Sequence, residues 1–260
     1  PAPTNDVTAV TTLRFTPYKG MNIALASAVS TWANFTTGEV VTSVPATTSL
    51  PFDIWARNVT STVTLDTTNW ATVSTRATAL AYLNGVYVKS GDVTRRYLAT
   101  GETTTTTGRI NDSASTRYLQ NYYNRILRNG LNTFSADRST TSTGYLEINT
   151  EIRCNFVVGV SEDAVFASAT GTYDNSGASN YVASAIAFDG ITAEAGFECL
   201  FNAPSANIDG SISLAGNKIG LAIGDHFATL LGKVSAGTGT WASATGAGTA
   251  KVYLHLGIFG

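Results

Sequence analysis

Short apolar runs separated by turn residues recur along almost the whole chain, and this pattern constrains the fold more than any other feature. Such runs are too short for most helices but suit strands, which typically contain about five or six residues. Leu146, Ile148 and Ile152 lie on alternate positions, as expected for a strand with one buried side. Asn84-Gly85 separates two runs and predicts a type I′ hairpin, because that turn needs positive φ at both central residues.

The sequence therefore predicts an all-β protein, an antiparallel β-sandwich of jelly-roll type with one or two short helices. Apolar residues within 118–127 follow helical spacing and favour the first helix, although Tyr and Asn are mediocre helix formers, so 113–128 stays open between helix and strand. Residues 226–234 are a second helical candidate, whose length Gly232 limits. Two stretches rich in small residues, 100–108 and 235–251, are expected to be surface loops.

Three parts are expected along the chain. Residues 1–30 would form an N-terminal arm and a first strand, and residues 31–130 a β-rich domain. After a polar boundary at 129–143, residues 144–260 would form the C-terminal β-sandwich.

The low charge content narrows the classes of partner. Only 13% of the residues are charged, against about 25% in an average domain, whereas 43% are hydrophobic, which argues against disorder. Few charges and much Thr suit β-sheet surfaces and large packing interfaces. The formal net charge of −2 gives no electrostatic support for a nucleic-acid partner or an anionic membrane. No apolar run approaches the roughly 18 residues that span a bilayer, so we expect no membrane insertion.

Reactive side chains show no catalytic or metal-binding pattern. The adjacent carboxylates Glu162 and Asp163 diverge rather than flank a bond, and neither His226 nor His255 follows a GxSxG sequence. We therefore expect no catalytic residue, no cofactor and no metal site, and no enzymatic activity.

The two cysteines lie in separate apolar runs. Synthesis in a reducing compartment favours buried free thiols for Cys154 and Cys199, and a disulfide between neighbouring strands stays open.

Arginines and tyrosines concentrate between residues 89 and 128. Guanidinium groups stack on aromatic rings and pair with carboxylates, for which Asp92 and Asp112 are candidates. We expect this block to form buried strand or subunit contacts rather than a nucleic-acid surface. The expected structural and interface residues are Arg95, Arg96, Tyr97, Arg117, Tyr122, Tyr123, Asn124 and Arg125.

The same block carries a resemblance. VYVKSGDVTRRYLATGETTT (86–105) and DSASTRYLQNYYNR (112–125) resemble a block found in exterior virion proteins of tailed bacteriophages. TLRFTPYKGMNIAL (12–25) and FDIWARN (52–58) are similar to the opening of that family, and FVVGVSED (156–163) extends the likeness more loosely. The chain departs from the family at Ala99, where members often have Gly, and at Gln120, where they have Trp.

The resemblance implies a non-enzymatic structural protein on the exterior of a virion, made in the host cytoplasm. The first interpretation of this resemblance is a tail fibre or adsorption protein that is attached to the particle through residues 1–30. Its partners would be other copies, as a homotrimer, other virion proteins, and a host surface glycan or protein. Exposed tyrosines and Trp241 would suit carbohydrate stacking. One alternative is a capsid decoration protein that stabilises the head, and a second is a polysaccharide-degrading tailspike.

Overall fold

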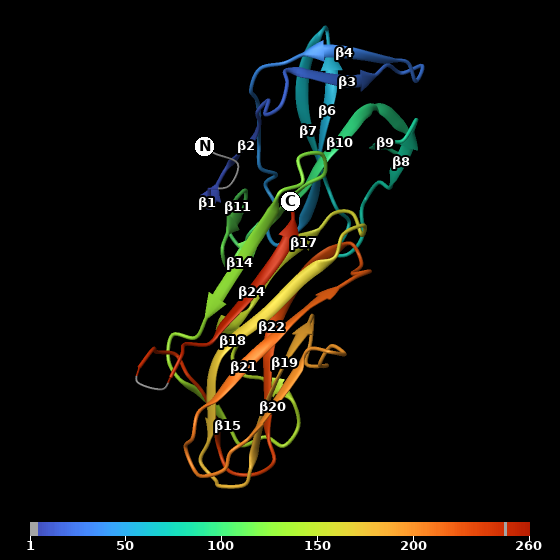
Figure 1. Cartoon of the computed structure of the whole chain (residues 1–260). Helices are drawn as coiled ribbons and strands as arrows, with labels where there is room; N and C mark the ends of the chain where they lie inside the picture. The colour runs from blue at the N-terminus through green and yellow to red at the C-terminus, as the bar shows by residue number, and fades with distance from the viewer. Residues whose placement is uncertain (1–4, 247–248) are drawn as a thin grey trace.

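The computed structural model describes residues 5–246 and 249–260. It is an elongated molecule built almost wholly of strands, with the N-terminal strands at one end and the C-terminal strands at the other (Figure 1). Within the described residues the one helical element is the 3₁₀ turn η1 (Thr150–Ile152). The predicted all-β class is thus confirmed. No described helix is long and apolar enough to cross a membrane.

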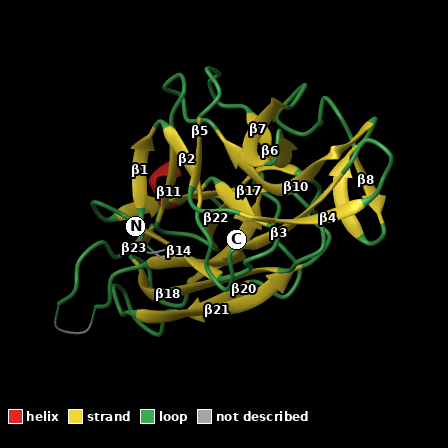
Figure 2. Cartoon of the chain, turned by 90° about the horizontal axis from the view of Figure 1, so that it is seen from above, coloured by secondary structure: helices red, strands yellow, loops and turns green. Residues whose placement is uncertain are grey.

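The N-terminal end is organised around a six-stranded sheet in the order β7-β6-β10-β9-β8, with β13 also paired to β10. Two ribbons, β2-β5 and β3-β4, pack against this sheet (Figure 2). Apolar side chains from all three, including Leu13, Leu25, Phe52 and Leu65, form one core. The strands at this end are β2 (Thr12–Phe15), β3 (Asn22–Ala26), β4 (Trp32–Thr36), β5 (Val40–Ser43), β6 (Pro51–Val59), β7 (Thr62–Asn69), β8 (Leu80–Leu83), β9 (Val86–Lys89), β10 (Asp92–Glu102) and β13 (Leu119–Asn121).

The C-terminal end is a sandwich of two sheets. The first has the order β1-β11-β12-β17-β22-β19-β20, with β16 also on β22, and every pair in it is antiparallel except β12-β17. Its strands are β1 (Val7–Val10), β11 (Ile110–Ser113), β12 (Thr116–Arg117), β16 (Leu146–Glu147), β17 (Cys154–Val158), β19 (Tyr181–Phe188), β20 (Glu198–Asn202) and β22 (Gly224–Val234).

The second sheet has the order β14-β24-β18-β23-β15, with β21 along the other edge of β18. Its strands are β14 (Leu127–Thr133), β15 (Arg138–Thr140), β18 (Val165–Asn175), β21 (Gly210–Lys218), β23 (Gly239–Trp241) and β24 (Tyr253–Phe259). Phe134, Phe156, Tyr173, Leu230 and Trp241 are among the fully buried side chains between the two sheets.

The side of β14, β24, β18 and β21 that points away from this core is named the outer face. The strand registers place Leu131, His255, Ser168 and Ala215 in one row across it. No Lys, Arg, Asp or Glu occurs on the face. It comprises Leu127, Asn129, Leu131, Thr133, Phe166, Ser168, Thr170, Ser211, Ser213, Ala215, Asn217, Tyr253, His255, Gly257 and Phe259.

Both predicted helices are wrong. Residues 113–128 form the short strands β12 and β13 and the beginning of β14, because successive residues are recruited by different sheets. Residues 226–234 lie inside β22, which is flanked by β17 and β19 and buried on both sides. A strand buried on both sides is apolar throughout and carries no two-residue period, so it is easily mistaken for a helix.

Two predicted surface loops are partly strand. Thr100, Gly101 and Glu102 end β10 and are buried, so only the middle of 100–108 is exposed. Within 235–251, β23 carries Trp241, which is fully buried, and residues 247–248 lie outside the described residues. The proposal that Trp241 stacks on carbohydrate is therefore wrong.

The expected limits of the arm and of the two domains do not coincide with the limits of the sheets. Residues 1–4 lie outside the described residues, whereas β1 pairs with β11 of the same chain. β14 and β15 precede residue 144 yet belong to the C-terminal sandwich. The limits 1–30, 31–130 and 144–260 stay a prediction from the sequence, and the sheets run across them.

The predicted hairpin and free thiols are confirmed. Asn84 and Gly85 have φ of 53° and 82° and join β8 to β9. Cys154 and Cys199 are free, and their strands β17 and β20 are separated by β22 and β19, so no disulfide links neighbouring strands. Only Cys154 is fully buried, since Cys199 is half-buried.

Trp241 should be a main determinant of sandwich stability. Its indole N–H donates to Ser184 Oγ at 2.8 Å, and its ring stacks on Tyr173 at 6.3 Å between centroids. Trp241→Phe removes the donor and leaves the buried hydroxyl unpaired, so we expect a loss of about 1–3 kcal/mol in the free energy of unfolding. Urea denaturation measures this loss. Ile219→Ala, at a side chain that is 72% exposed, is the control, and equal losses for both variants would contradict the assignment.

Candidate functional site

The Arg/Tyr block does not form one site. Its members separate into a buried polar network at the joint between the two ends of the molecule, two clusters of ion pairs, and a group of tyrosines at the surface. The joint also uses residues outside the block, which sequence reasoning missed.

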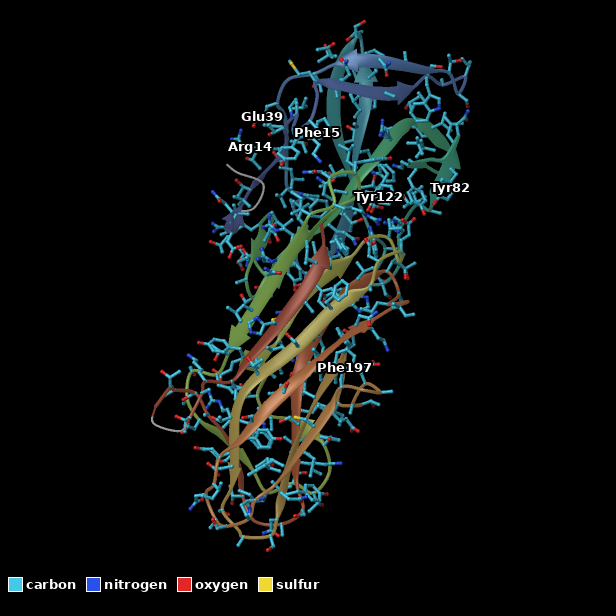
Figure 3. The ribbon with its side chains drawn as sticks, in the orientation of Figure 1. Arg14, Phe15, Glu39, Tyr82, Tyr122 and Phe197 are labelled. Carbon is cyan, nitrogen blue, oxygen red and sulfur yellow. The ribbon has the colours of Figure 1, made fainter. Side chains whose placement is uncertain are left out.

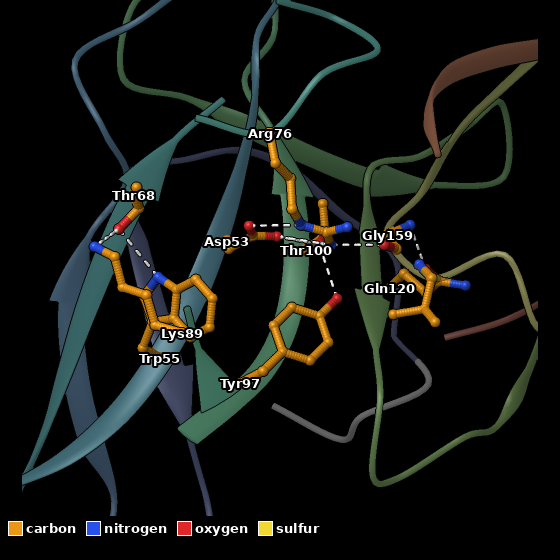
Figure 4. A network of polar contacts seen from close by, with 10 residues as sticks. Asp53, Trp55, Thr68, Arg76, Lys89, Tyr97, Thr100, Gln120 and Gly159 are labelled. Carbon is orange, nitrogen blue, oxygen red and sulfur yellow. Dashed lines mark hydrogen bonds and ion pairs between the residues drawn. The ribbon is translucent and has the colours of Figure 1, made fainter. Parts of the chain in front are cut away.

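The buried network is centred on an ion pair between Arg76 and Asp53 (Figure 4). Arg76 Nε donates to Asp53 Oδ2 at 2.8 Å and its Nη2 donates to Asp53 Oδ1 at 3.0 Å, so the pair is bidentate. The same Nη2 reaches the carbonyl of Gly159 at 2.6 Å, just after β17. Asp53 also accepts from Thr100 Oγ1 at 2.7 Å, and that hydroxyl hydrogen-bonds Tyr97 Oη at 2.8 Å. One guanidinium thus ties β6 and β10 to the sandwich.

Gln120 completes the joint from β13. Its side chain is buried, and its Oε1 accepts the backbone N–H groups of Gly159 and Val160. Gly159 has no room for a side chain, because a Cβ there would lie 2.5 Å from Thr100 Cβ. Gln120 therefore supplies an acceptor for two backbone donors.

A second ion cluster surrounds Asp112 and includes Arg117. Arg128 Nη2 donates to Asp112 at 2.8 Å, and Arg117 Nη1 lies 3.4 Å from the same carboxylate. Arg117 also reaches Asp6 at 2.9 Å and the carbonyl of Asn129 at 2.9 Å through Nε. All three central side chains are buried. Burial raises the pKa of Asp112, and the two arginines oppose that rise.

Arg95 lies near the start of β10, a central strand of the N-terminal sheet. It pairs with Asp92, the partner expected from the sequence, and with Asp66 at 3.0 Å. Its side chain is 25% exposed, so it is less buried than predicted.

The remaining block residues belong to the tyrosine cluster, defined as Tyr82, Tyr87, Tyr97, Tyr122 and Tyr123. Tyr97 is fully buried on Trp55, with 5.7 Å between ring centroids. From there the rings continue outward through Tyr122 and Tyr87 to the rim (Figure 3). Tyr82 stacks on Tyr87 at 4.2 Å and is 62% exposed, while Tyr123 meets Tyr122 at 5.0 Å and is 43% exposed.

Charged groups at the rim of the cluster balance one another. Arg96 lies over the Tyr123 ring at 4.4 Å, and Arg125 over the Tyr122 ring at 4.9 Å. Arg125 pairs with Asp163 at 2.9 Å and with Glu162 at 3.4 Å. The Arg125 side chain is 30% exposed, so its burial was overestimated from the sequence.

Hydroxyl groups of the cluster are held as donors. Glu162 accepts from Tyr87 Oη at 2.8 Å and from Tyr122 Oη at 3.3 Å. Burial, followed by the charge of Glu162, raises the pKa of Tyr122 to about 12. Asn124 stands beside the cluster, where its backbone N–H donates to Asn121 Oδ1 at 3.2 Å. The cluster therefore offers exposed aromatic rings beside polar groups of nearly zero net charge.

A separate carboxyl pair spans the joint. Glu102 ends β10 and is fully buried, and its carboxyl lies near Asp225 at the start of β22. Burial, followed by the negative charge of Asp225, raises the pKa of Glu102 well above its usual range. A second carboxylate nearby favours the protonated form of Glu102, and the burial of Glu102 closes it off from a substrate.

His226 is engaged on both ring nitrogens. Nδ1 lies 2.6 Å from Asp189 Oδ2, and Nε2 lies 2.9 Å from the carbonyl of Ala222. Burial lowers the pKa of His226, but the hydrogen bond with Asp189 and the charge of Asp189 outweigh it, and the net shift is upward. Neither nitrogen is free to act as a base. In the part of the chain that the structure describes, no group of three or more His, Cys, Asp or Glu could hold a metal ion.

Comparisons with known proteins do not identify the chain. No protein-family model and no curated protein matches it. Among solved structures, it is similar to infectious bursal disease virus, Gx strain, with 9% identity and a TM-score of 0.33 over 98% of this chain and 72% of the other. It is also similar to the insecticidal delta-endotoxin Cry8Ea1 from Bacillus thuringiensis, with 7% identity and a TM-score of 0.31 over 97% and 53%. A β-porphyranase from Bacteroides plebeius gives 8% identity and 0.28 over 82% and 30%. Scores this low carry no argument about function.

The Arg76–Asp53 pair should contribute more to stability than the Arg125 pairs. Arg76→Ala leaves Asp53 buried and unpaired, which costs roughly 3–5 kcal/mol. Arg125→Ala removes an ion pair that water already screens, worth about 0–1 kcal/mol. Thermal unfolding of both variants measures the contrast, and Arg125→Ala is the matched control. A larger loss for Arg125→Ala would contradict the position assigned to the joint.

The raised Glu102 pKa predicts a pH dependence of stability. A carboxyl whose pKa is higher in the folded than in the unfolded chain stabilises fully below the unfolded value, which is 4.5, and loses that contribution as the pH rises toward the folded value. Glu102→Gln should therefore raise the melting temperature at pH 8, by about 2–4 °C for each kcal/mol gained, and change it little at pH 4.5. Asp209→Asn, at an exposed carboxyl, is the control. An equal effect of Glu102→Gln at both pH values would refute the prediction.

Proposed function

We propose that this chain is a non-enzymatic structural protein of a virion, and that it acts as an adsorption protein whose tyrosine cluster contacts a host surface glycan. The observation that carries the proposal is the cluster itself. Tyr82 and Tyr123 expose their rings beside buried aromatic residues that fix their positions. Sugars present C–H faces that stack on such rings and hydroxyls that hydrogen-bond to groups at the rim.

The charge balance of the cluster favours a neutral ligand. Arg96 and Arg125 are matched by Glu162 and Asp163. A phosphate or a single-stranded nucleic acid requires a groove of positive charge beside the stacking rings, and the chain as a whole has a formal net charge of −2. A glycan needs no such excess.

The geometry of the titratable groups supports the absence of hydrolysis. Hydrolysis of a glycosidic bond requires two carboxyl groups separated by about 5 Å or more across the bond. Glu102 is fully buried, and Glu162 and Asp163 are bound to Arg125. This arrangement ranks a polysaccharide-degrading tailspike last.

A capsid decoration protein is the second candidate function. The broad outer face, with no charged side chain, favours it, because such a face suits close packing against other subunits. The exterior position on a tailed bacteriophage belongs to the proposal and comes from the sequence resemblance. Cryo-electron microscopy of the intact virion separates a position on the tail from one on the head.

Glycan binding has a direct test. Isothermal titration with purified capsular and O-chain polysaccharides should show binding that Tyr82→Ala and Tyr123→Ala each weaken by about 2- to 10-fold, corresponding to roughly 0.5–1.5 kcal/mol for a lost aromatic contact. Tyr18→Ala is the matched control, since Tyr18 is 60% exposed and lies outside the cluster. An equal loss for Tyr18→Ala, or no binding by the parent protein, would count against the proposed site.

A further inference from the structure

We propose that two copies of this chain associate through the outer face, each presenting the same face to the other. This inference does not depend on the proposed glycan binding. It begins from the strand registers, which place the outward side chains of β14, β24, β18 and β21 in level rows across a continuous sheet. No described segment of the chain covers these rows, because Leu127, Leu131 and Phe166 are 48%, 39% and 44% exposed.

The outward side of the other sheet of the sandwich is covered by segments of the chain itself. There the outward residues Ala185, Ala187 and Leu231 are fully buried, because Tyr145 and Ala193 from flanking segments pack over them. The chain therefore covers one side of the sandwich. It leaves open the other side, that of β14, β24, β18 and β21 (Figure 1). Leu127, Leu131 and Phe166 form an exposed apolar part of this otherwise small and polar face, and exposed apolar patches mark interaction surfaces.

The absence of charge points to an identical copy as the occupant. When a face meets itself about a two-fold axis, any charged residue near the axis is brought close to its own like charge. The outer face has no Lys, Arg, Asp or Glu at its outward positions, although charges occur around it, such as Lys218, whose ion pair with Glu194 lies off the face. A charged partner would find no side chain of opposite charge on this face.

The dimensions of the face are sufficient for a stable pair. Four strands about 4.8 Å apart and about nine residues long give roughly 600 Å² in plan. This is of the same order as the ~800 Å² per partner of a standard interface. The surface is also shaped: a shallow groove of about 500 Å³ runs between Leu127, Phe166 and His255, where Gly257 carries no side chain. Apolar side chains of the second copy would enter this groove.

Sedimentation velocity of the full chain over a range of concentrations tests the proposal. The parent protein should show concentration-dependent pairing, and Leu131→Glu and Ala215→Glu should each weaken it at least 10-fold by placing like charges opposite each other. Val41→Glu is the matched control, since Val41 is 52% exposed on β5 at the other end of the molecule. Melting curves and circular dichroism confirm that each variant folds.

A mixing experiment tests whether the same face is used on both copies. Ala215→Glu and Ala215→Lys should each be monomeric alone, and an equimolar mixture should recover mixed pairs, detected by native mass spectrometry. A parent protein that stays monomeric throughout would overturn the proposal. So would pairing that the face variants leave intact, or a mixture that fails to recover pairs.

Discussion

The buried ion pair between Arg76 and Asp53 is the contact on which the arrangement of the molecule depends. A guanidinium this deep is tolerable only when its donors are satisfied, and here they reach Asp53, Thr100 and the carbonyl of Gly159. Those acceptors come from β6, β10 and the segment after β17, so one side chain fixes the N-terminal sheet against the sandwich. Because Thr100 also bonds the Tyr97 hydroxyl, the base of the tyrosine cluster is held by the same pair.

Much of this could be predicted from the sequence, and the remainder depended on contacts between distant residues. The all-β class and the Asn84-Gly85 turn follow from local rules, since strand periodicity and positive φ are properties of a few adjacent residues. Asp112 was expected to pair with arginines of its own short block, and its partners there are Arg117 and Arg128. Arg76 was missed because it stands alone in its segment and its partner is 23 residues away. Nothing local distinguishes it from a surface arginine.

The two predicted surface loops, 100–108 and 235–251, were partly wrong for one physical cause, which is that small residues were taken as a sign of exposure. Gly232 and Gly239 lie against the Trp241 ring, and a Cβ at Gly232 would come within 2.3 Å of it. The segment around Trp241 is poor in large side chains because the indole fills the space that its neighbours leave. Likewise, the Thr-rich stretch after Tyr97 supplies Thr100 and Glu102 to the joint. Small and polar residues mark a loop only where no large side chain occupies the space beside them.

The distribution of charge links the joint to the two proposed surfaces. With only 13% of residues charged, the chain places most of its buried ion pairs where the two ends meet and around Asp112. Ion pairs need specific partners at fixed distances, so they suit a joint that must adopt one geometry. A sheet face that must accept an identical copy has the opposite requirement, because each charge would face itself. The low charge content is therefore consistent with a nearly neutral tyrosine cluster and with an outer face that packs against the same face of a second copy. The few buried ion pairs are concentrated at the joint, which they hold in one geometry.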